Sequence, residues 1–348
     1  MLAHSSRFSR PLALAALLLA ATGARATTLQ PTLLQGVGGM TTANSSSGHR
    51  AIGSGYSPDG STTSALLWDL RHPEAAPTIL ATHDGYMSGF AVSRAISDHY
   101  ATGQELQLPS DAPATFRAVV WDLDHPGRLP TVLSNGGFVS AAPFAMQGAF
   151  IAGAAVDADG NVTGVLWDLR HPTAAPRALL AGAQMFGFAG NYVVGLVLDG
   201  STPSPIVLFD LTDLSRAPKF LNATGTQVAF TGSGRYVGGA DEANITALLW
   251  DVKKPKAAPR VLADPASGII LGLDDDWAVG ITADNRGFAV SLEDPRRPAI
   301  TLDAGPGNFS VAFGVDGKYV MGYINSDNGV PQAAFWRLAG SDCDRDDD

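Results

Sequence analysis

Short apolar stretches alternate with pairs of turn-forming residues along almost the whole chain beyond residue 26. Stretches of this length, bounded by Gly, Asn, Asp and Pro, are typical of β-strands joined by tight turns. Asx-Gly pairs flanked by apolar residues are typical of β-hairpins, and they occur at Asp59-Gly60, Asp159-Gly160, Asp199-Gly200 and Asn328-Gly329. The pattern therefore predicts an all-β protein built from short strands.

The strands form a unit that recurs seven times, with a period of 41 to 53 residues. One strand of each unit ends in a three-residue phrase, which is Trp-Asp plus an apolar residue in the four clearest units. A period in this range is typical of propellers, solenoids or arrays. The phrases are Trp68-Asp69-Leu70, Trp121-Asp122-Leu123, Trp167-Asp168-Leu169, Phe209-Asp210-Leu211, Trp250-Asp251-Val252, Ser291-Leu292-Glu293 and Trp336-Arg337-Leu338.

A glycine precedes this phrase in every unit and stands three residues after an aromatic residue, except in the first unit, where Arg50 replaces the aromatic. A glycine that recurs inside a strand indicates a β-bulge or a close approach of two backbones. The position therefore predicts packing rather than catalysis. The glycines are Gly53, Gly103, Gly153, Gly195, Gly239, Gly280 and Gly322.

The repeat array begins and ends at different points of the repeat unit. A proline-rich connector follows each Trp-type phrase and leads to a short outer strand, as in Pro77 to Leu80, and proline suits an edge strand. The array opens on such an outer strand, Pro31 to Leu34, and closes on the Trp-type phrase at residues 336–338. Closing a ring with its first and last strands removes exposed sheet edges. We therefore predict a seven-bladed β-propeller closed by pairing of N- and C-terminal strands in one blade. Gly287 to Leu302, the Trp-less copy, is where this blade count would fail, and six blades would leave a strand unpaired.

The first 26 residues have the pattern of an export signal. Arg7 and Arg10 precede the apolar run Leu12 to Ala21, and Ala24-Arg25-Ala26 follows as an A-x-A cleavage site. No other stretch of the sequence is long and apolar enough to span a membrane. We expect a signal peptide at 1–26, the propeller at 27–340, and a location in the periplasm or outside the cell.

The C-terminal residues 341–348 are acidic and lack apolar side chains, which is typical of a disordered tail. Cys343, the only cysteine in the sequence, lies in this tail. A single cysteine excludes an intramolecular disulfide, so the repeated apolar faces must stabilise the fold. A thiol that links two chains is an alternative use of Cys343, although we expect a monomer.

Two repeat families share these features. Strands that end in Trp-Asp, one per blade, resemble WD repeats, but the Gly-His pair of that family occurs once, at Gly48-His49. The stretches Ser64 to Trp68, Arg117 to Trp121 and Gln332 to Trp336, each following the recurrent glycine, resemble the HAF-type repeats of exported bacterial proteins more closely. The histidine that names those repeats is missing here. This second resemblance implies an exported repeat protein, in a family that usually has no assigned activity.

Charge is unevenly distributed along the repeat. Without residues 1–26 the chain keeps 20 basic and 33 acidic residues, a net charge of −13, which argues against a nucleic-acid partner. In the predicted strand order, most basic residues lie in the connectors on one face of the ring. The opposite face carries the Asx-Gly hairpins and the loops after the outer strands, and most of the acids. This acidic face could attract a cationic partner, or it could simply keep the protein soluble.

Candidate site residues are few, and each has an ordinary structural explanation. Asp157 and Asp159 begin like a calcium loop but lack its distal Glu, so calcium is a weak alternative to an Asx turn. His83 and Asp84 follow an outer strand and could lie near the mouth of the ring. Asp241 and Glu242 lie in a turn on the same acidic face. The sequence contains no nucleophile elbow, zinc-protease motif, phosphate loop or dinucleotide fingerprint.

These observations favour an exported, soluble, non-enzymatic binding module without a cofactor, with a protein or carbohydrate ligand and its acidic face as the contact surface. The alternative is a secreted carbohydrate hydrolase, because two catalytic carboxylates need only ~5–10 Å separation in space and sequence cannot exclude such a pair. A purely structural component of the cell envelope is a third possibility. A deep mouth with two facing carboxylates would favour the hydrolase.

Overall fold

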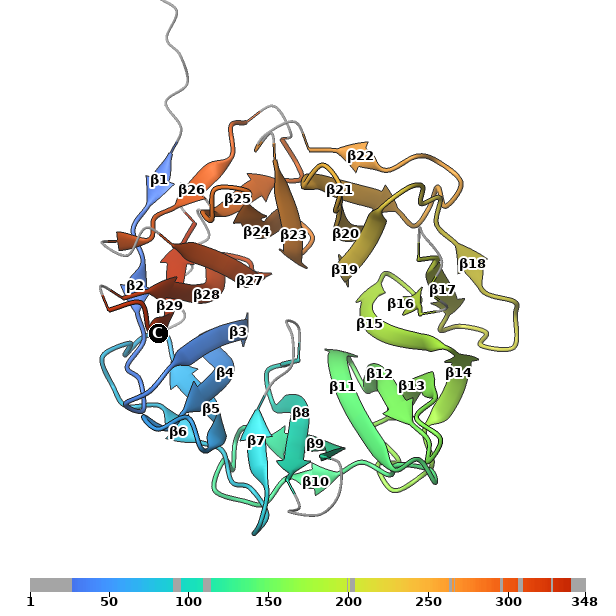
Figure 1. Cartoon of the computed structure of the whole chain (residues 1–348), viewed down its shortest axis with the longest axis horizontal. Helices are drawn as coiled ribbons and strands as arrows, with labels where there is room; N and C mark the ends of the chain where they lie inside the picture. Colours follow the sequence, from blue (N-terminus) through green and yellow to red (C-terminus); the bar gives the residue numbers. More distant parts are fainter. Residues whose placement is uncertain are drawn as a thin grey trace, which may run out of the picture.

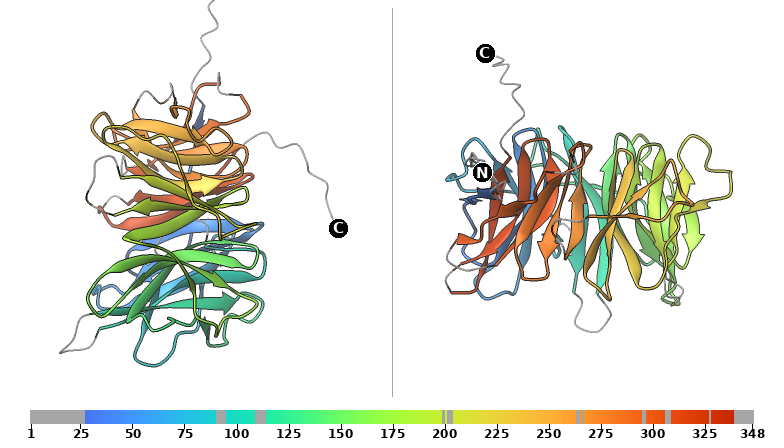
Figure 2. Two further views of the ribbon diagram at one scale, coloured as in Figure 1. Left: turned by 90° about the vertical axis from the view of Figure 1, so that its right-hand side faces the viewer. Right: turned by 90° about the horizontal axis from the view of Figure 1, so that it is seen from above.

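The computed structural model describes residues 27–89, 95–108, 114–198, 200, 204–262, 265, 267–294, 297–305, 309–326 and 328–338. The described residues form 29 strands in seven sheets arranged around a central axis (Figure 1). Seen from the side, the ring is a disc with two faces (Figure 2). The predicted seven-bladed β-propeller is therefore confirmed, and the Trp-less copy forms a complete blade.

Each blade has four strands, which we call a, b, c and d from the axis outward. They are β3 (Thr41–Ser47), β4 (Arg50–Tyr56), β5 (Thr63–Asp69) and β6 (Thr78–Ile79) in blade 1; β7 (Met87–Gly89), β8 (Tyr100–Gln107), β9 (Thr115–Asp122) and β10 (Thr131–Val132) in blade 2; β11 (Ser140–Gln147), β12 (Phe150–Val156), β13 (Val162–Asp168) and β14 (Arg177–Ala181) in blade 3; β15 (Ala183–Ala189), β16 (Tyr192–Val197), β17 (Ile206–Asp210) and β18 (Lys219–Phe220) in blade 4; β19 (Gln227–Ser233), β20 (Tyr236–Asp241), β21 (Thr246–Asp251) and β22 (Arg260–Val261) in blade 5; β23 (Gly268–Leu273), β24 (Trp277–Thr282), β25 (Gly287–Ser291) and β26 (Ile300–Leu302) in blade 6; and β27 (Ser310–Asp316), β28 (Tyr319–Asn325), β29 (Pro331–Arg337) and β2 (Thr32–Leu33) in blade 7.

Both ends of the chain complete blade 7, as predicted. β2 pairs antiparallel with β29 and supplies the d strand of this blade. Leu34, just beyond β2, is fully buried and packs with Met321 of blade 7 and Trp68 of blade 1. β1 (Thr28–Leu29) adds a feature that the sequence did not predict, because it pairs in parallel with β26 as a fifth strand of blade 6. The N-terminal segment thus joins two neighbouring blades.

The recurrent glycines of the b strands lie opposite β-bulges. In six blades the pairing of strands a and b shifts by one residue beside the glycine, as between Ala43 and Ser45 opposite Gly53. A Cβ atom on Gly53 would lie 1.8 Å from the carbonyl oxygen of Thr42. The backbone of strand a therefore occupies the space of a side chain, which confirms the predicted close approach.

The tryptophans of the c strands connect neighbouring blades. Each motif indole is at most 2% exposed, and its Nε1–H donates to a backbone carbonyl just after the d strand of the preceding blade, at 2.7–3.0 Å. The hydrophobic clusters likewise combine residues of two adjacent blades. The core thus consists of layers between blades, which explains why the motif repeats with the blade.

The assignment of the sixth phrase was wrong by one residue. Val290 pairs with Ala278 as Trp68 pairs with Ala51, so the phrase is Val290-Ser291-Leu292 rather than Ser291-Leu292-Glu293. Valine lacks the indole that marks this position elsewhere. Phe209 and Trp336 occupy their predicted places.

The connectors and the a–b turns share one face, which we call the connector face. The backbone N–H after each c strand donates to a carbonyl of the a–b turn in the same blade, as Leu70 does to His49 at 2.8 Å. Connector arginines lie here with the motif carboxylates, and Arg71 pairs with Asp69 at 2.7 Å. The connector face is therefore mixed in charge rather than simply basic.

The other face carries the b–c hairpins and the d–a loops, and it remains the acidic face. Its described residues include eight acids and the basic residues Arg117 and Arg286. These acids are Asp59, Asp84, Asp157, Asp159, Asp241, Glu242, Asp284 and Asp303.

Candidate binding site at the mouth of the central channel

The six candidate residues lie on the acidic face but do not form one site. His83 and Asp84 lie in the loop between blades 1 and 2, Asp157 and Asp159 in the β12–β13 turn, and Asp241 and Glu242 at the β20–β21 turn. Three separate loops of the ring thus carry them. Among the described residues, no three His, Cys, Asp or Glu side chains are placed to hold a metal ion.

His83 belongs to a polar cluster around the buried Glu105 of blade 2. Its Nδ1 lies 3.1 Å from both carboxylate oxygens of Glu105, and its backbone N–H donates to Oε1 at 2.9 Å. Glu105 is fully buried and also accepts a hydrogen bond from Nε of Arg117 at 2.7 Å. The Arg117 guanidinium lies 3.7 Å from the centre of the Tyr86 ring. The cluster fixes the 81–86 loop against blade 2, which is a structural role.

Asp157 and Asp241 cap their own turns. Asp157 accepts hydrogen bonds from the backbone N–H groups of Asp159 and Asn161 and from the Asn161 side chain, each at 2.9 Å. Asp241 accepts from Thr226 at 2.5 Å and from Asn244 at 3.2 Å. These bonds, led by the Asn161 and Thr226 side chains, lower the pKa of each carboxyl. A calcium ion at Asp157 would have to displace these donors, so the bonds favour the Asx turn.

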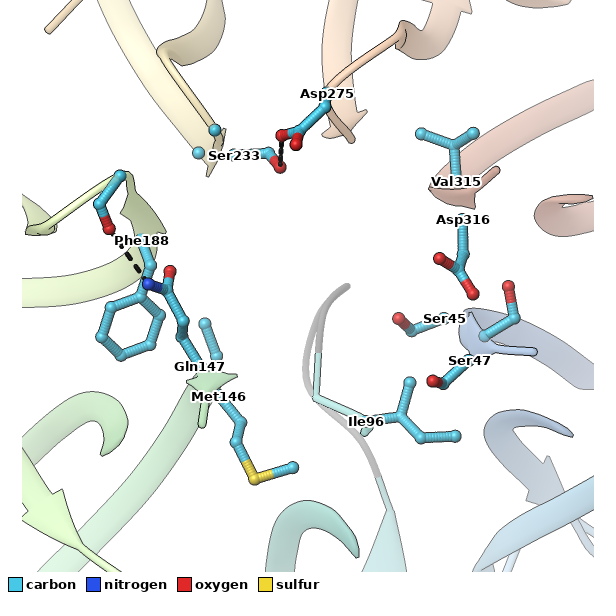
Figure 3. Close-up of a pocket in the computed structure, with 15 residues that line it drawn as sticks. Ser45, Ser47, Ile96, Met146, Gln147, Phe188, Ser233, Asp275, Val315 and Asp316 are labelled. Atoms are coloured by element: carbon cyan, nitrogen blue, oxygen red, sulfur yellow. Dashed lines mark hydrogen bonds between the residues drawn. The ribbon is translucent and has the colours of Figure 1, made fainter. Parts of the chain in front are cut away.

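A channel runs along the axis of the ring, and its mouth on the connector face lies opposite the candidate residues of the acidic face. All seven blades contribute to a cavity of about 360 Å³ at this mouth (Figure 3). Its wall is formed by the ends of the a strands and by the a–b turns, where the chain reverses at the mouth. The lining residues are Ser45, Ser46, Ser47, Ile96, Ala145, Met146, Gln147, Phe188, Gly190, Gly232, Ser233, Gly234, Asp275, Val315 and Asp316. Cavities of this size hold small ligands or single side chains.

Hydrogen bonds between neighbouring blades position the polar groups of this mouth. Gln147 donates to the carbonyl of Gly190 at 3.0 Å, and Ser47 donates to Asp98 at 2.6 Å. Asp316 accepts from the backbone N–H of Gly48 at 3.0 Å, and Asp275 lies 3.5 Å from the Ser233 hydroxyl. The rim is therefore a ring of contacts between blades, with its side chains held in place.

Asp275 packs against a glycine of the preceding blade. A Cβ atom on Gly234 would lie 2.1 Å from Oδ1 of Asp275, so the carboxylate occupies the space that a side chain at this position would need. The neighbouring Asp274 is 8% exposed and accepts from the backbone N–H of Gly317 at 2.9 Å. Asp274 therefore connects blades 6 and 7.

The two carboxylates of the mouth do not face each other. Asp275 points toward Ser233, whereas Asp316 lies on the next blade and points toward the side of Ser45 and Ser47 (Figure 3). Each is held by a different neighbouring blade. Asp275 and Asp316 therefore do not form the pair of facing carboxylates that we expected of a hydrolase. The hydrolase stays an alternative that this geometry does not test.

Two described arginines at or beside the a–b turns are paired with carboxylates. Arg235 pairs with Asp251, and Arg50 pairs with Asp124 at 2.9 Å. In the connectors, hydrogen bonds from Arg71 and Arg170 lower the pKa of Asp69 and of Asp168 to about 2. The described lining residues themselves include two carboxylates and no Lys, Arg or His.

Sequence reasoning missed these mouth residues, although a signal exists. The position three residues before the start of strand b is the last residue of strand a in five of the seven blades, and strand b begins with the aromatic of the repeat in six. Six of these seven positions are polar: Ser47, Ser97, Gln147, Ser233, Asp274 and Asp316, with Ala189 as the exception. A polar residue repeated at a fixed place beside the channel would have identified the rim.

No protein-family model and no curated protein matches the sequence. Solved structures with a similar fold do exist. Puromycin hydrolase aligns with a TM-score of 0.59 and 13% identity over 89% of this chain and 55% of its own. A post-proline cleaving enzyme from Rickettsia typhi aligns with a TM-score of 0.57 and 10% identity over 83% of this chain and 50% of its own. This chain thus spans about half the length of those two enzymes.

The β-propeller domain of the trilobed protease from Pyrococcus furiosus aligns over 95% of its length and 85% of this chain, with a TM-score of 0.54 and 9% identity. That domain is described as having an open velcro topology, whereas β2 completes blade 7 here. At these identities the likeness shows the propeller fold alone. No helix of the described residues has the length and apolar character needed to cross a membrane.

Proposed function

We propose that the protein is an exported, non-enzymatic binding module whose ligand enters the mouth of the central channel on the connector face. One observation carries this proposal: all seven blades contribute to a single cavity of about 360 Å³. Ligand sites are concave and hold a few well-placed polar groups. The serines, Gln147 and the two carboxylates supply such groups here, and Met146 and Phe188 supply apolar contact.

The hydrogen bonds of the rim support binding. Its polar side chains are held by hydrogen bonds to adjacent blades, so little conformational freedom is lost when a ligand is bound. The resemblance to HAF-type repeats and the signal-like residues 1–26 support export. The ligand is a protein or a carbohydrate, and the connector-face mouth replaces the acidic face as our proposed contact surface.

Blocking the mouth tests this proposal. Gln147 is exposed at the rim, so Gln147→Trp should fill part of the cavity without disturbing the core. Gln107, exposed at the end of β8 on the acidic face, provides the matched control Gln107→Trp. The protein from residue 27 onward is screened by thermal shift against oligosaccharides and short peptides, because a ligand that binds the native state raises the melting temperature.

We expect shifts that are lost in Gln147→Trp and retained in Gln107→Trp. Ligands that stabilise Gln147→Trp as much as the unmodified protein would place the binding site elsewhere and contradict the proposal.

A further inference from the structure

We propose that a second pocket, between blades 1 and 2, binds an aromatic side chain of a partner protein. This inference goes beyond the proposed function, because the pocket shares no lining residue with the channel mouth. The pocket has a volume of about 220 Å³ and lies on the connector face. Arg50, Leu67 and Arg71 of blade 1 and Leu123 of blade 2 are among the residues that line it.

The pocket lies where the repeat lacks its aromatic residue. Six b strands begin with Tyr, Phe or Trp, whereas the b strand of blade 1 begins with Arg50. Arg50 and Phe150 occupy equivalent places, because each pairs in its sheet with the aspartate of the Trp-Asp phrase. In five blades the aromatic shares a hydrophobic cluster with the residue just before the motif tryptophan or its substitute, as Phe150 does with Leu166. The fold itself therefore places an aromatic ring at this point of the repeat.

In blade 1 the apolar residue under this place is left uncovered. Leu67, the residue before the motif Trp68, lines the pocket and is partly exposed. The guanidinium of Arg50 is directed to blade 2, where it pairs with Asp124 at 2.9 Å and donates to the carbonyl of Asp98 at 2.7 Å. The residues equivalent to Leu67 in the other blades are all buried: Val120, Leu166, Leu208, Leu249, Ala289 and Phe335.

An arginine is already positioned to stack on a ring in this pocket. Blades 1 and 3 share the phrase Trp-Asp-Leu-Arg-His-Pro, and in both the arginine pairs with the motif aspartate at 2.7 Å. In blade 3 the Arg170 guanidinium lies 5.6 Å from the centre of the Phe150 ring. Arg71, held in the same way, lines the pocket of blade 1. A ligand ring in the equivalent place would therefore gain a cation–π contact with Arg71 and apolar contact with Leu67.

The size of the pocket suits one side chain better than a whole small molecule. A cavity of about 150 Å³ can hold a benzene ring, whereas sites for whole small molecules usually measure about 300–1,000 Å³. Ile79, next to the lining residue Thr78 on the outer strand β6, is 57% exposed and extends the apolar surface beyond the pocket. Aromatic side chains that fill such pockets anchor protein interfaces.

Filling the pocket from within tests the proposal. Arg50→Phe restores the aromatic of the repeat and should close the pocket. Arg50→Ala is the matched control, because it removes the same ion pair with Asp124 and leaves the pocket open. Phe150→Ala is the converse change, which should open the equivalent space beside Leu166 in blade 3.

Leucine methyl groups report binding directly. Leu67 lines the pocket, whereas the neighbouring Leu66 is fully buried between blades 7 and 1 and serves as the internal control. The protein carries ¹³C-methyl leucine, and Leu67→Ile assigns the Leu67 signals. It is titrated in separate experiments with an acetylated and amidated pentapeptide, Gly-Gly-Phe-Gly-Gly, with the same peptide centred on leucine, and with toluene, which is the phenylalanine side chain alone.

We expect a saturable shift of the Leu67 signals with the phenylalanine peptide, with Leu66 unchanged. The leucine peptide should bind roughly fivefold more weakly, as for loss of one cation–π contact. The response should disappear in Arg50→Phe and persist in Arg50→Ala. In Phe150→Ala a shift of the Leu166 signals should appear in addition.

The proposal is overturned if the phenylalanine peptide does not shift Leu67, if the leucine peptide binds equally tightly, or if Arg50→Phe responds as Arg50→Ala does. A response to toluene alone would assign the pocket to small aromatic molecules and overturn the protein partner. A folded Phe150→Ala variant without a Leu166 shift would contradict the idea that the missing ring creates the site. Gln147→Trp should leave the Leu67 response unchanged, so a failure here is distinguishable from a failure of the proposed function at the mouth.

Discussion

Replacing a recurrent b-strand glycine by alanine should destabilise the propeller. The loss of stability should be larger where less space is left for the added Cβ atom. A Cβ atom on Gly280 would lie 1.8 Å from the carbonyl oxygen of Ile269 and 2.9 Å from its carbon. An ordinary contact needs about 3.4 Å or more, so the a and b strands of blade 6 would have to separate by more than an ångström. Overpacking of this kind costs about 1–3 kcal/mol, and each lost hydrogen bond adds about 1 kcal/mol.

We therefore expect Gly280→Ala to lower the free energy of unfolding by about 3 kcal/mol, measured by denaturant unfolding followed by tryptophan fluorescence. Gly127→Ala is the control, because no atom lies within 4 Å of its added Cβ. It should change stability by no more than ~0.5 kcal/mol.

Two further variants turn this prediction into a graded series. At Gly153 the nearest carbonyl oxygen is 2.2 Å from the added Cβ, and at Gly195 it is 2.7 Å, with the flexible Met185 side chain at 2.5 Å. The loss of stability should therefore decrease from Gly280→Ala to Gly153→Ala to Gly195→Ala. Equal stability of Gly280→Ala and Gly127→Ala would refute the idea that the bulges require these glycines.

Three other perturbations follow from the structure. Arg117→Met leaves the fully buried Glu105 carboxylate without its arginine partner. Thermal or denaturant unfolding should then show that the free energy of unfolding falls by about 3–5 kcal/mol. A fall below ~1 kcal/mol would mean that the fold does not need this ion pair. Leu34→Ala removes a fully buried side chain at the seam between blades 7 and 1. The free energy of unfolding should fall by about 2–5 kcal/mol in the same measurement, and an unchanged value would mean that β2 does not close the ring. The Arg71 hydrogen bond lowers the pKa of Asp69 from 3.8 to about 2, so its contribution is present above pH ~4 and is lost as the pH falls toward 2. In Asp69→Asn, stability should fall less steeply across that window, and an unchanged acid profile would contradict the assignment.

The fold could be predicted from the sequence because its markers repeat for a packing reason. Each motif tryptophan connects two blades, and in six blades the recurrent glycine accommodates a bulge, so both recur with the blade. The offset between the first and last strands predicted the closure. The one-residue error at Val290 arose where the indole is missing. β1 was not predicted because a two-residue strand whose partners lie 273 positions away in the sequence leaves no local pattern.

The site was harder to predict, because the residue types that suggested it also form turns. Asp157 and Asp241 were conspicuous in the sequence for the same reason that they cap turns: a short carboxylate bonds to nearby backbone N–H groups. The mouth residues Gln147, Asp275 and Asp316 are distant in the sequence and meet only when the ring closes. The signal peptide, the tail and Cys343 lie outside the described residues and stay predictions.

Hydrogen–deuterium exchange of the protein with a ligand from the thermal-shift screen tests the proposed site most directly, because it distinguishes the two faces of the disc. If the ligand enters the connector-face mouth, protection should appear in the a–b turns at residues 47–50, 147–150, 233–236 and 316–319. Protection confined to the acidic-face hairpins at residues 57–62, 157–161 and 241–246 would contradict the account and restore the acidic face as the contact surface.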